Sequence, residues 1–184
     1  MATLVPESHQ ALHAIAEEVP REDIASARIQ KIIRDMRAVL HSYKGGEFTG
    51  VAIAAPQIGV PLRIFLIEDT GPDKKDAHAD APRLPTLVAI NPRLVKLSKQ
   101  KRLMNEGCLS VDDSYGAVLR STHATLRAYD ERGISYQRGA SGLLAQIFQH
   151  EVDHLDGILF LDRAEEVINK DLAPKKKPPK KVSL

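Results

Sequence analysis

The sequence predicts one α+β domain in which short, mostly antiparallel strands pack around a central helix, with an amphipathic helix near the N-terminus. Three observations predict this class. A chain of 184 residues fits a single domain. Its middle part contains several short apolar runs separated by breaks, and helical periodicity is found on either side of them. The expected domain covers residues 1–169, and the Lys/Pro-rich residues 170–184 are expected to form a disordered tail.

The first helix is expected over residues 23–43, where Gly45 and Gly46 would end it. Most apolar positions in this segment recur every three or four residues, which is the pattern of a helix that buries one face. These positions are Ile24, Ile29, Ile32, Ile33, Met36, Val39 and Leu40.

Strands are expected in the central part of the chain. The apolar run at 64–67 indicates a buried strand, and the polar residues 69–85 indicate a surface loop. The segment Asp130 to Gly133 resembles a hairpin turn. Further strands are expected at 86–90 and 93–97, on either side of an Asn91-Pro92 break, and at 117–119 and 124–129.

The second helix is expected to begin after Ser141 as its N-cap and to end at Gly157. Its apolar stripe at i, i+4, i+7 and i+11 contains two histidines, so they should face the interior. The stripe consists of Leu143, Ile147, His150 and His154. Residues 163–169 are expected to add a helical turn or two.

Residues 150–154 read His-Glu-Val-Asp-His, an HExxH pattern. Two imidazoles at i and i+4 on a helix can reach one metal ion, and the adjacent Glu151 can approach a bound water without being a ligand. Two solvated histidines on a polar face are the simpler alternative, but buried imidazoles need partners. A third ligand could be any other His, Asp, Glu or Cys. No His follows the pattern, and the sole cysteine, Cys108, precedes it.

Composition excludes several other classes of protein. No run approaches the roughly 18 apolar residues of a membrane span, and the N-terminus does not resemble a signal peptide. The absence of Trp and an aromatic fraction of 4% argue against a base-stacking surface for nucleic acid. One cysteine allows no internal disulfide, which suits a reducing compartment. We therefore expect a cytoplasmic protein, with a mature organellar form as the alternative.

Three segments resemble the three sequence motifs of the peptide deformylase family, in the family's order. They are residues 50–59 (GVAIAAPQIG), 106–110 (EGCLS) and 149–155 (QHEVDHL). Smaller matches lie at 90–92 and 142–146, so the resemblance spans residues 4–163. Three motifs that occur together are far more specific than HExxH alone.

The resemblance implies a metallohydrolase that removes the N-formyl group from the formyl-methionine of newly made proteins and releases formate. It implies that Cys108, His150 and His154 bind one divalent metal ion. Fe²⁺ is the family's usual metal, with Zn²⁺, Ni²⁺ or Co²⁺ as alternatives. Metal-bound hydroxide would attack the formyl carbon, with Glu151 as general base and then general acid. The expected partners are N-formyl-methionyl peptides and nascent chains.

The resemblance also implies roles for residues around the metal. The side-chain amide of Gln57 and the backbone N–H of Leu109 would stabilise the charge on the formyl oxygen. Arg120 and Asp153 would form a structural ion pair behind the histidine helix. An edge strand would pair with the substrate peptide, beside a methionine pocket. The residues implied in substrate binding are Gly50, Val51, Ala52, Ile53 and Ile147.

One departure from the family pattern falls in the first motif, where the family usually has Gly and Leu at the positions of Ala52 and Ile53. The extra methyl group of Ala52 lies beside the implied peptide path. It removes no catalytic group. We therefore expect activity to persist, and the effect of this methyl group on substrate preference stays open.

Three other interpretations remain at this point. A zinc endopeptidase would use HExxH but leaves Cys108 and the first motif unexplained. A metal-binding protein without catalysis would not need Glu151 or Gln57. The basic residues 175–181 suggest a weak ribosome contact, although such tails are more often simply solvated. No membrane and no specific nucleic acid are expected as partners.

Overall fold

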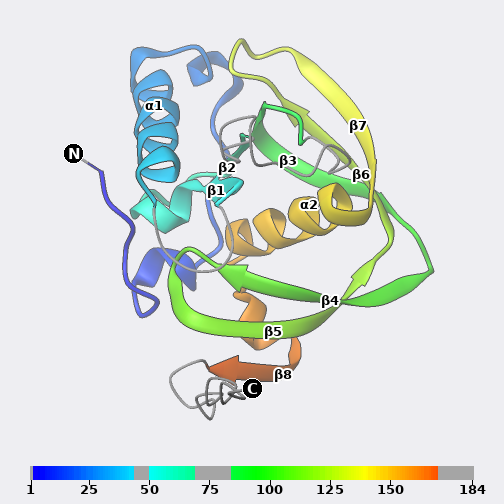
Figure 1. Ribbon diagram of the computed structural model, residues 1–184. Helices are drawn as coiled ribbons and strands as arrows, with labels where there is room; N and C mark the ends of the chain where they lie inside the picture. Colours follow the sequence, from blue (N-terminus) through cyan, green and yellow to red (C-terminus); the bar gives the residue numbers. More distant parts are fainter. Residues whose placement is uncertain (1, 44–49, 69–83, 170–184) are drawn as a thin grey trace, which may run out of the picture.

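The computed structural model describes residues 2–43, 50–68 and 84–169, which form two antiparallel sheets with one helix between them (Figure 1). The predicted α+β class is thereby confirmed. The five-stranded sheet has the order β1 (Ala52–Ala54), β2 (Ile64–Ile67), β3 (Leu87–Leu97), β6 (His123–Tyr129) and β7 (Ser135–Ser141). The three-stranded sheet has the order β4 (Lys101–Cys108), β5 (Val111–Ser121) and β8 (Ala164–Asn169).

Helix α1 (Ala27–Ser42) packs on one face of the larger sheet. It begins later than the expected residue 23, because a 3-10 turn (Arg21–Asp23) precedes it and Ser26 is the N-cap. The Ser26 hydroxyl accepts a hydrogen bond from the N–H of Ile29 at 3.3 Å. The buried side chains of α1 contact the inner residues of β1, β2 and β3, so the predicted amphipathic face is confirmed. Gly45 and Gly46 lie outside the described residues.

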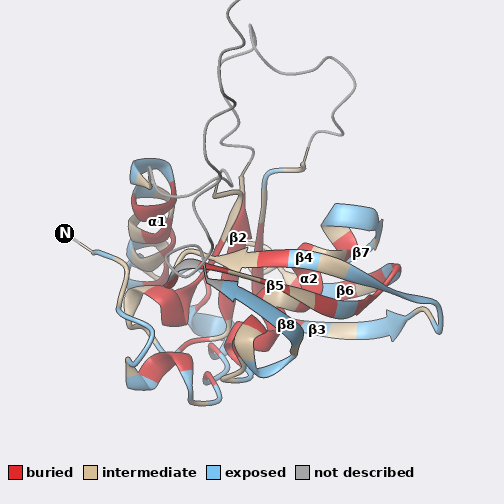
Figure 2. Ribbon diagram, turned by 60° about the horizontal axis from the view of Figure 1, so that its bottom comes forward, coloured by how far each residue is buried: buried red, intermediate tan, exposed pale blue. Residues whose placement is uncertain are grey.

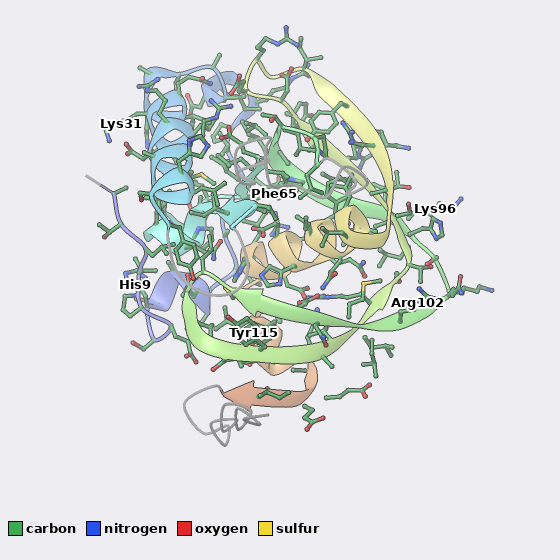
Figure 3. The ribbon with its side chains drawn as sticks, in the orientation of Figure 1. His9, Lys31, Phe65, Lys96, Arg102 and Tyr115 are labelled. Carbon is green, nitrogen blue, oxygen red and sulfur yellow. The ribbon has the colours of Figure 1, made fainter. Side chains whose placement is uncertain are left out.

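Helix α2 (Gly142–Leu155) lies between the two sheets, and most of its residues after the first turn are buried (Figure 2). Phe148 packs against Phe65 of β2, with 6.3 Å between ring centroids, and Phe65 lies in the interior (Figure 3). On the other side, the Gln149 side chain bonds both the N–H and the C=O of Ser121 in β5 at 3.0 Å. These contacts fix the helix against both sheets.

The two ends of α2 differ from each other. Gly157 has φ of +73° and follows the helix, as predicted. Ser141 is the N-cap residue, but its side chain makes no capping hydrogen bond. Leu143 is 51% exposed, so its expected place in the buried stripe was wrong. The first residues of α2 are exposed or half-buried, and burial begins at Ala145.

The expected break at Asn91-Pro92 is a bulge within one continuous strand, β3. Asn91 has a φ of +51°, and the register with β6 shifts between Ile90 and Arg93. The Asn91 side chain bonds the N–H and the C=O of Val19, both at 2.8 Å. The irregular residue therefore joins the N-terminal segment to the sheet, while the strand continues beyond it.

The second half of the fold contains more strand than expected. Strand β5 extends well beyond 117–119, and β4 and β7 were not predicted at all. The expected helical turns at 163–169 were wrong, because residues 164–169 form β8 and pair with β5. Residues Val167 and Ile168 favour a strand, and the free edge of β5 provides its partner. A 3-10 turn, Phe160–Asp162, precedes this strand, and another, Gln10–Leu12, lies near the N-terminus.

The predicted turn after β6 is present. Asp130 accepts hydrogen bonds from the N–H groups of Arg132 and Ile134, and Gly133 has a φ of +78°. Most of the expected loop at 69–85 and all of the expected tail at 170–184 lie outside the described residues. Within the described ranges, no helix has the length and apolarity of a membrane span.

Candidate functional site

The two histidines of HExxH and the sole cysteine meet between α2 and the end of β4. His150 and His154 lie one turn apart on α2, with ring centroids 4.8 Å apart and an interplanar angle of 84°. Cys108 is the last residue of β4, and its Sγ lies 3.3 Å from Nε2 of His154. One ligand atom from each of the three residues lies within 4.8 Å of the others. The fold thus brings together residues 46 positions apart.

This donor set fits one divalent metal ion. Bonds of about 2.0–2.3 Å to nitrogen and sulfur would hold tetrahedral ligand atoms roughly 3.5 Å apart. The donor atoms of Cys108 and His154 lie 3.3 Å apart, and all three donor atoms lie within 4.8 Å of one another, on one strand and one helix. One sulfur and two imidazole nitrogens suit Fe²⁺, Zn²⁺, Ni²⁺ and Co²⁺, and three protein ligands leave a position for water.

The two imidazoles differ in their affinity for a proton. Burial lowers the pKa of His150, but its hydrogen bonds with Cys108 and Glu106 raise that pKa well above the usual value. Burial and the neighbouring charge of His150 hold the pKa of His154 well below the usual value. The cluster therefore holds a proton with which a metal ion would compete.

Glu106 orients the first histidine. Its Oε2 lies 3.0 Å from Nδ1 of His150, which leaves Nε2 of that ring for the metal position. Arg120 donates to both oxygens of Glu106, at 2.8 and 2.9 Å. Burial raises the pKa of Glu106, but the hydrogen bonds from Arg120 and His150 outweigh it and lower that pKa to about 2. Glu106 is therefore an ionised, buried partner of the ligand.

The implied pair between Arg120 and Asp153 is present behind α2. Nη1 of Arg120 lies 2.6 Å from Oδ2 of Asp153, and Arg163 contacts the same carboxylate at 2.7 Å. Arg120 is 4% exposed. A single buried guanidinium therefore connects Glu106, beside His150, with Asp153 on the same helix.

Glu151 is the carboxylate beside the ligands. It is 4% exposed, and its Oε2 has no hydrogen-bond partner among the described residues. Burial raises the pKa of Glu151 to about 7. Buried polar atoms are nearly always hydrogen-bonded, so an unpaired carboxylate oxygen at this place indicates room for a polar group such as water.

Gln57 directs its amide toward the same place. It lies in the 3-10 turn Ala55–Ile58, and its Oε1 accepts the N–H of Ala54 at 2.8 Å. That bond fixes the amide orientation. Nε2 consequently faces Sγ of Cys108 and Oγ of Ser110, each at 3.4 Å. Leu109, the other residue implied to stabilise charge, directly follows Cys108.

The residues implied in substrate binding lie at or near the edge of the larger sheet. Strand β1 is an edge strand that pairs with β2, and the pairing continues to Val51, whose C=O accepts the N–H of Glu68. Ala52 and Ile53 lie in β1, whereas Gly50 precedes it. Ile147 is only 7% exposed and packs with the core of α2.

Gly50, in the first motif, packs closely against Leu109 of the second motif. A Cβ atom at this position would lie 3.1 Å from Cδ2 of Leu109 and 3.2 Å from Cδ1 of Leu40. A side chain at position 50 would therefore push against Leu109, next to Cys108 of the candidate metal site. Glycine suits this position because the side chains of Leu109 and Leu40 lie close to its backbone, and its φ angle does not itself require glycine.

Sequence reasoning gave no role to Glu106 or Ser110, although both lie in the EGCLS motif. Glu106 stands two residues before Cys108 in a strand that was not predicted, and the register with β5 shifts between them. Alternation along the sequence alone therefore could not place both side chains toward the site. Gln149 was likewise quoted only as part of a motif, because its role depends on the distant Ser121.

Comparison with known proteins adds independent information. The family model described as Polypeptide deformylase matches residues 1–170. Chloroplastic peptide deformylase 1A of Solanum lycopersicum is 39% identical over 169 residues, which cover 89% of this chain and 59% of that protein. The chloroplastic/mitochondrial peptide deformylase 1A of Arabidopsis thaliana is 42% identical over 166 residues, covering 87% and 60%. The chain thus spans about 60% of the length of these relatives.

Solved structures show the same fold. A peptide deformylase from Synechococcus elongatus in complex with actinonin has a TM-score of 0.74 at 31% identity, covering 90% of this chain and 79% of that one. A Met-Ala-Ser-bound class I type b enzyme from Acinetobacter baumannii has a TM-score of 0.75 at 32% identity, covering 87% and 96%. Among the described residues, the similarity therefore extends over both sheets and α2.

Proposed function

Because the chain belongs to the polypeptide deformylase family, we propose that it removes the formyl group from N-formyl-methionyl peptides and nascent chains and releases formate. One observation carries the proposal. Cys108, His150 and His154 offer donor atoms within 4.8 Å of one another, beside a buried carboxylate with an unpaired oxygen. An HExxH endopeptidase has no use for the cysteine, whereas a deformylase requires it as a ligand.

The metal we propose is Fe²⁺, with Zn²⁺, Ni²⁺ or Co²⁺ as substitutes. When bound, such an ion would lower the pKa of a water molecule and polarise the formyl carbonyl. Cys108, His150 and His154 would hold it, and Glu106 keeps the His150 ring in the required orientation.

Glu151 acts as the general base and then the general acid. Its carboxylate is buried and belongs to the residue that directly follows His150 in α2. In the proposed reaction it takes a proton from the attacking water and then delivers it to the departing amine nitrogen. General acid–base catalysis of this kind contributes on the order of 10²–10⁴ in rate.

Gln57 and Leu109 stabilise the negative charge that develops on the formyl oxygen. The bond from Ala54 N–H to Gln57 Oε1 turns the amide N–H₂ into the site, where it faces Cys108 Sγ and Ser110 Oγ. The Leu109 N–H follows the ligand Cys108 directly along the chain. Loss of one such donor typically costs on the order of 10²–10³ in rate.

The edge strand β1 receives the substrate. An extended peptide can add beside Gly50, Val51, Ala52 and Ile53 by backbone pairing, because β1 has a neighbour on one side only among the strands of the described residues. We propose that the formyl-methionine side chain enters next to Ile147. The methyl group of Ala52 would then narrow the entrance and change substrate preference.

The proposed unit is the domain of residues 1–169, and the cytoplasm of a bacterium or the interior of an organelle is its proposed location. Support comes from the residues matched to the family and from the bacterial, chloroplastic and mitochondrial names of the relatives. A weak ribosome contact through the basic tail stays a prediction, since residues 170–184 lie outside the described residues.

The decisive experiment is anaerobic purification, metal analysis and an assay of formate release from formyl-Met-Ala. We expect one metal ion per chain and formate release. Glu151→Ala should keep the metal and lose at least about 100-fold in turnover. Glu165→Ala, which changes an exposed carboxylate on β8, serves as the matched control and should match the wild type. Cleavage of internal peptide bonds without formate, or full turnover by Glu151→Ala, would overturn the proposal.

A further inference from the structure

The larger sheet has a second face that the metal site does not use. Helix α2 packs on one face through a core cluster that includes Leu126 and Ala128 of β6. Side chains alternate along a strand, so Arg127, between these two residues, points to the opposite face. On that face, α1 covers the β1–β2 side of the sheet (Figure 1). Arg127 is exposed.

A hollow of about 570 Å³ lies on this uncovered part, between the N-terminal segment and strands β3 and β6. Its lining has a net positive charge, because it contains three arginines and one carboxylate. The lining consists of Glu18, Val19, Pro20, Arg21, Asn91, Arg93, Arg127, Ala128, Tyr129 and Ser135.

Two of the arginines stand directly opposite each other. Arg93 of β3 and Arg127 of β6 are cross-strand partners in the antiparallel register. Like charges in this position destabilise a sheet. Glu18 offsets the charge of Arg93, with which it forms an ion pair. Arg127 forms no ion pair with any residue in the described ranges, so its charge is left without a partner there.

Other contacts position the third arginine, Arg21, and the N-terminal segment that forms one wall of the hollow. The Arg21 guanidinium lies over the ring of Tyr129, 5.7 Å from its centroid. The two hydrogen bonds between Asn91 and Val19 fix the N-terminal segment against β3. The hollow is therefore formed by the N-terminal segment together with β3 and β6, and guanidinium groups lie on both sides of it.

We propose that this hollow binds a phosphate group. Guanidinium groups present paired N–H donors that match phosphate oxygens, and a bound anion would relieve the repulsion between Arg93 and Arg127. The phosphate could belong to a small phosphorylated molecule or to an RNA backbone. This site is independent of the proposed deformylase activity, since it lies on the other face of the sheet.

The test measures binding of inorganic phosphate, and separately of a single-stranded RNA oligonucleotide, to the metal-loaded full-length protein at low salt. We expect saturable binding that Arg127→Gln weakens about tenfold. Arg138→Gln is the matched control. It removes the same charge from the adjacent strand β7, at the position opposite Leu126 and outside the hollow, and should change the affinity less than twofold.

Stability separates loss of the site from loss of the fold. Without phosphate, Arg127→Gln should unfold at the same temperature as the wild type or higher, because it removes a like-charge contact. Phosphate should raise the midpoint of the wild type and of Arg138→Gln, but not that of Arg127→Gln. If RNA is the source, Arg127→Gln should also reduce the slope of log affinity against log salt by about one. The proposal is overturned if neither ligand binds, or if both variants weaken binding equally.

Discussion

Replacement of Arg120 by methionine tests the buried charge network behind the metal site. Arg120→Met keeps much of the side-chain volume and removes the guanidinium. The variant loses two hydrogen bonds to Glu106, at 2.8 and 2.9 Å, and one to Asp153 at 2.6 Å. Glu106 and Asp153 are buried, at 4% and 8% exposure, so neither carboxylate can turn to solvent in place of the lost partner.

Two routes give the size of the effect. Removal of one partner from a buried ion pair costs about 3–5 kcal/mol. Asp153 keeps Arg163, and Glu106 keeps His150, so the lower end applies. The second route is the pKa of Glu106, which Arg120 and His150 together lower from 4.5 to about 2 against the effect of burial, a net shift of about 3 kcal/mol that the two partners share. We therefore expect Arg120→Met to lower the free energy of unfolding by about 3 kcal/mol at neutral pH.

The same shift predicts how the loss depends on pH. A carboxylate whose pKa is lowered in the folded state adds stability above its unfolded pKa, and this stability disappears as the pH falls through the folded value. The stability that ionised Glu106 adds to the wild type should therefore be full above about pH 4.5 and be lost as the pH falls toward about 2, so the difference between the wild type and Arg120→Met should shrink over that range.

Urea unfolding followed by circular dichroism suits the measurement, because the chain contains no Trp for fluorescence. The midpoint of thermal unfolding should fall by roughly 6–12 °C. Arg102→Met is the matched control. Arg102 is the cross-strand partner of Arg120 but is exposed at the outer end of β4 (Figure 3), so its loss should cost less than about 0.5 kcal/mol. A cost below about 1 kcal/mol for Arg120→Met, or equal costs for the two variants, would refute the reasoning.

Three further perturbations follow from the fold and the metal site. Gly157→Ala should cost about 3 kcal/mol or more in thermal unfolding, because a Cβ there would lie 2.9 Å from a backbone carbon of His13 at a φ of +73°. Gly142→Ala, at a φ of +55° with open space, should cost only about 1 kcal/mol, and equal costs would show that the contact is unimportant. Gln149→Leu leaves two buried backbone groups of Ser121 unpaired and should cost about 2–4 kcal/mol, with faster amide hydrogen exchange at that residue as the direct measurement. Removal of the metal with a chelator should lower the calorimetric midpoint by an amount equivalent to about 4 kcal/mol if the ion was present at 1,000 times its Kd, and an unchanged midpoint would contradict the proposed ligand set.

The sequence predicted the structure correctly where the residues of a repeating pattern all lie within one helix. HExxH lies within one helix, so the i, i+4 spacing alone predicted the placement of His150 and His154. The buried face of α1 was predicted for the same reason. Motifs far apart in the chain could be related to one another only through the family resemblance.

Prediction failed where pairing partners decide the structure. Strand β4 has exposed residues on one face and places Glu106 and Cys108 toward the site, so it lacks an apolar alternation. Strand β7 is a polar edge strand, and β8 depends on the free edge of β5. The Glu106–Arg120 contact was missed for the same reason, because its register exists only in the assembled sheet.

The separation of Cys108 from the histidines has a consequence for how the protein acquires its metal. The cysteine and His154 are 46 positions apart, so closing this loop in an unfolded chain costs about 3 kcal/mol of entropy. The ion should therefore be captured late, after α2 has docked between the sheets. Once bound, it would act as a reversible cross-link between a strand and a helix. Its release would undo this cross-link, so metal loss should loosen the contact between β4 and α2.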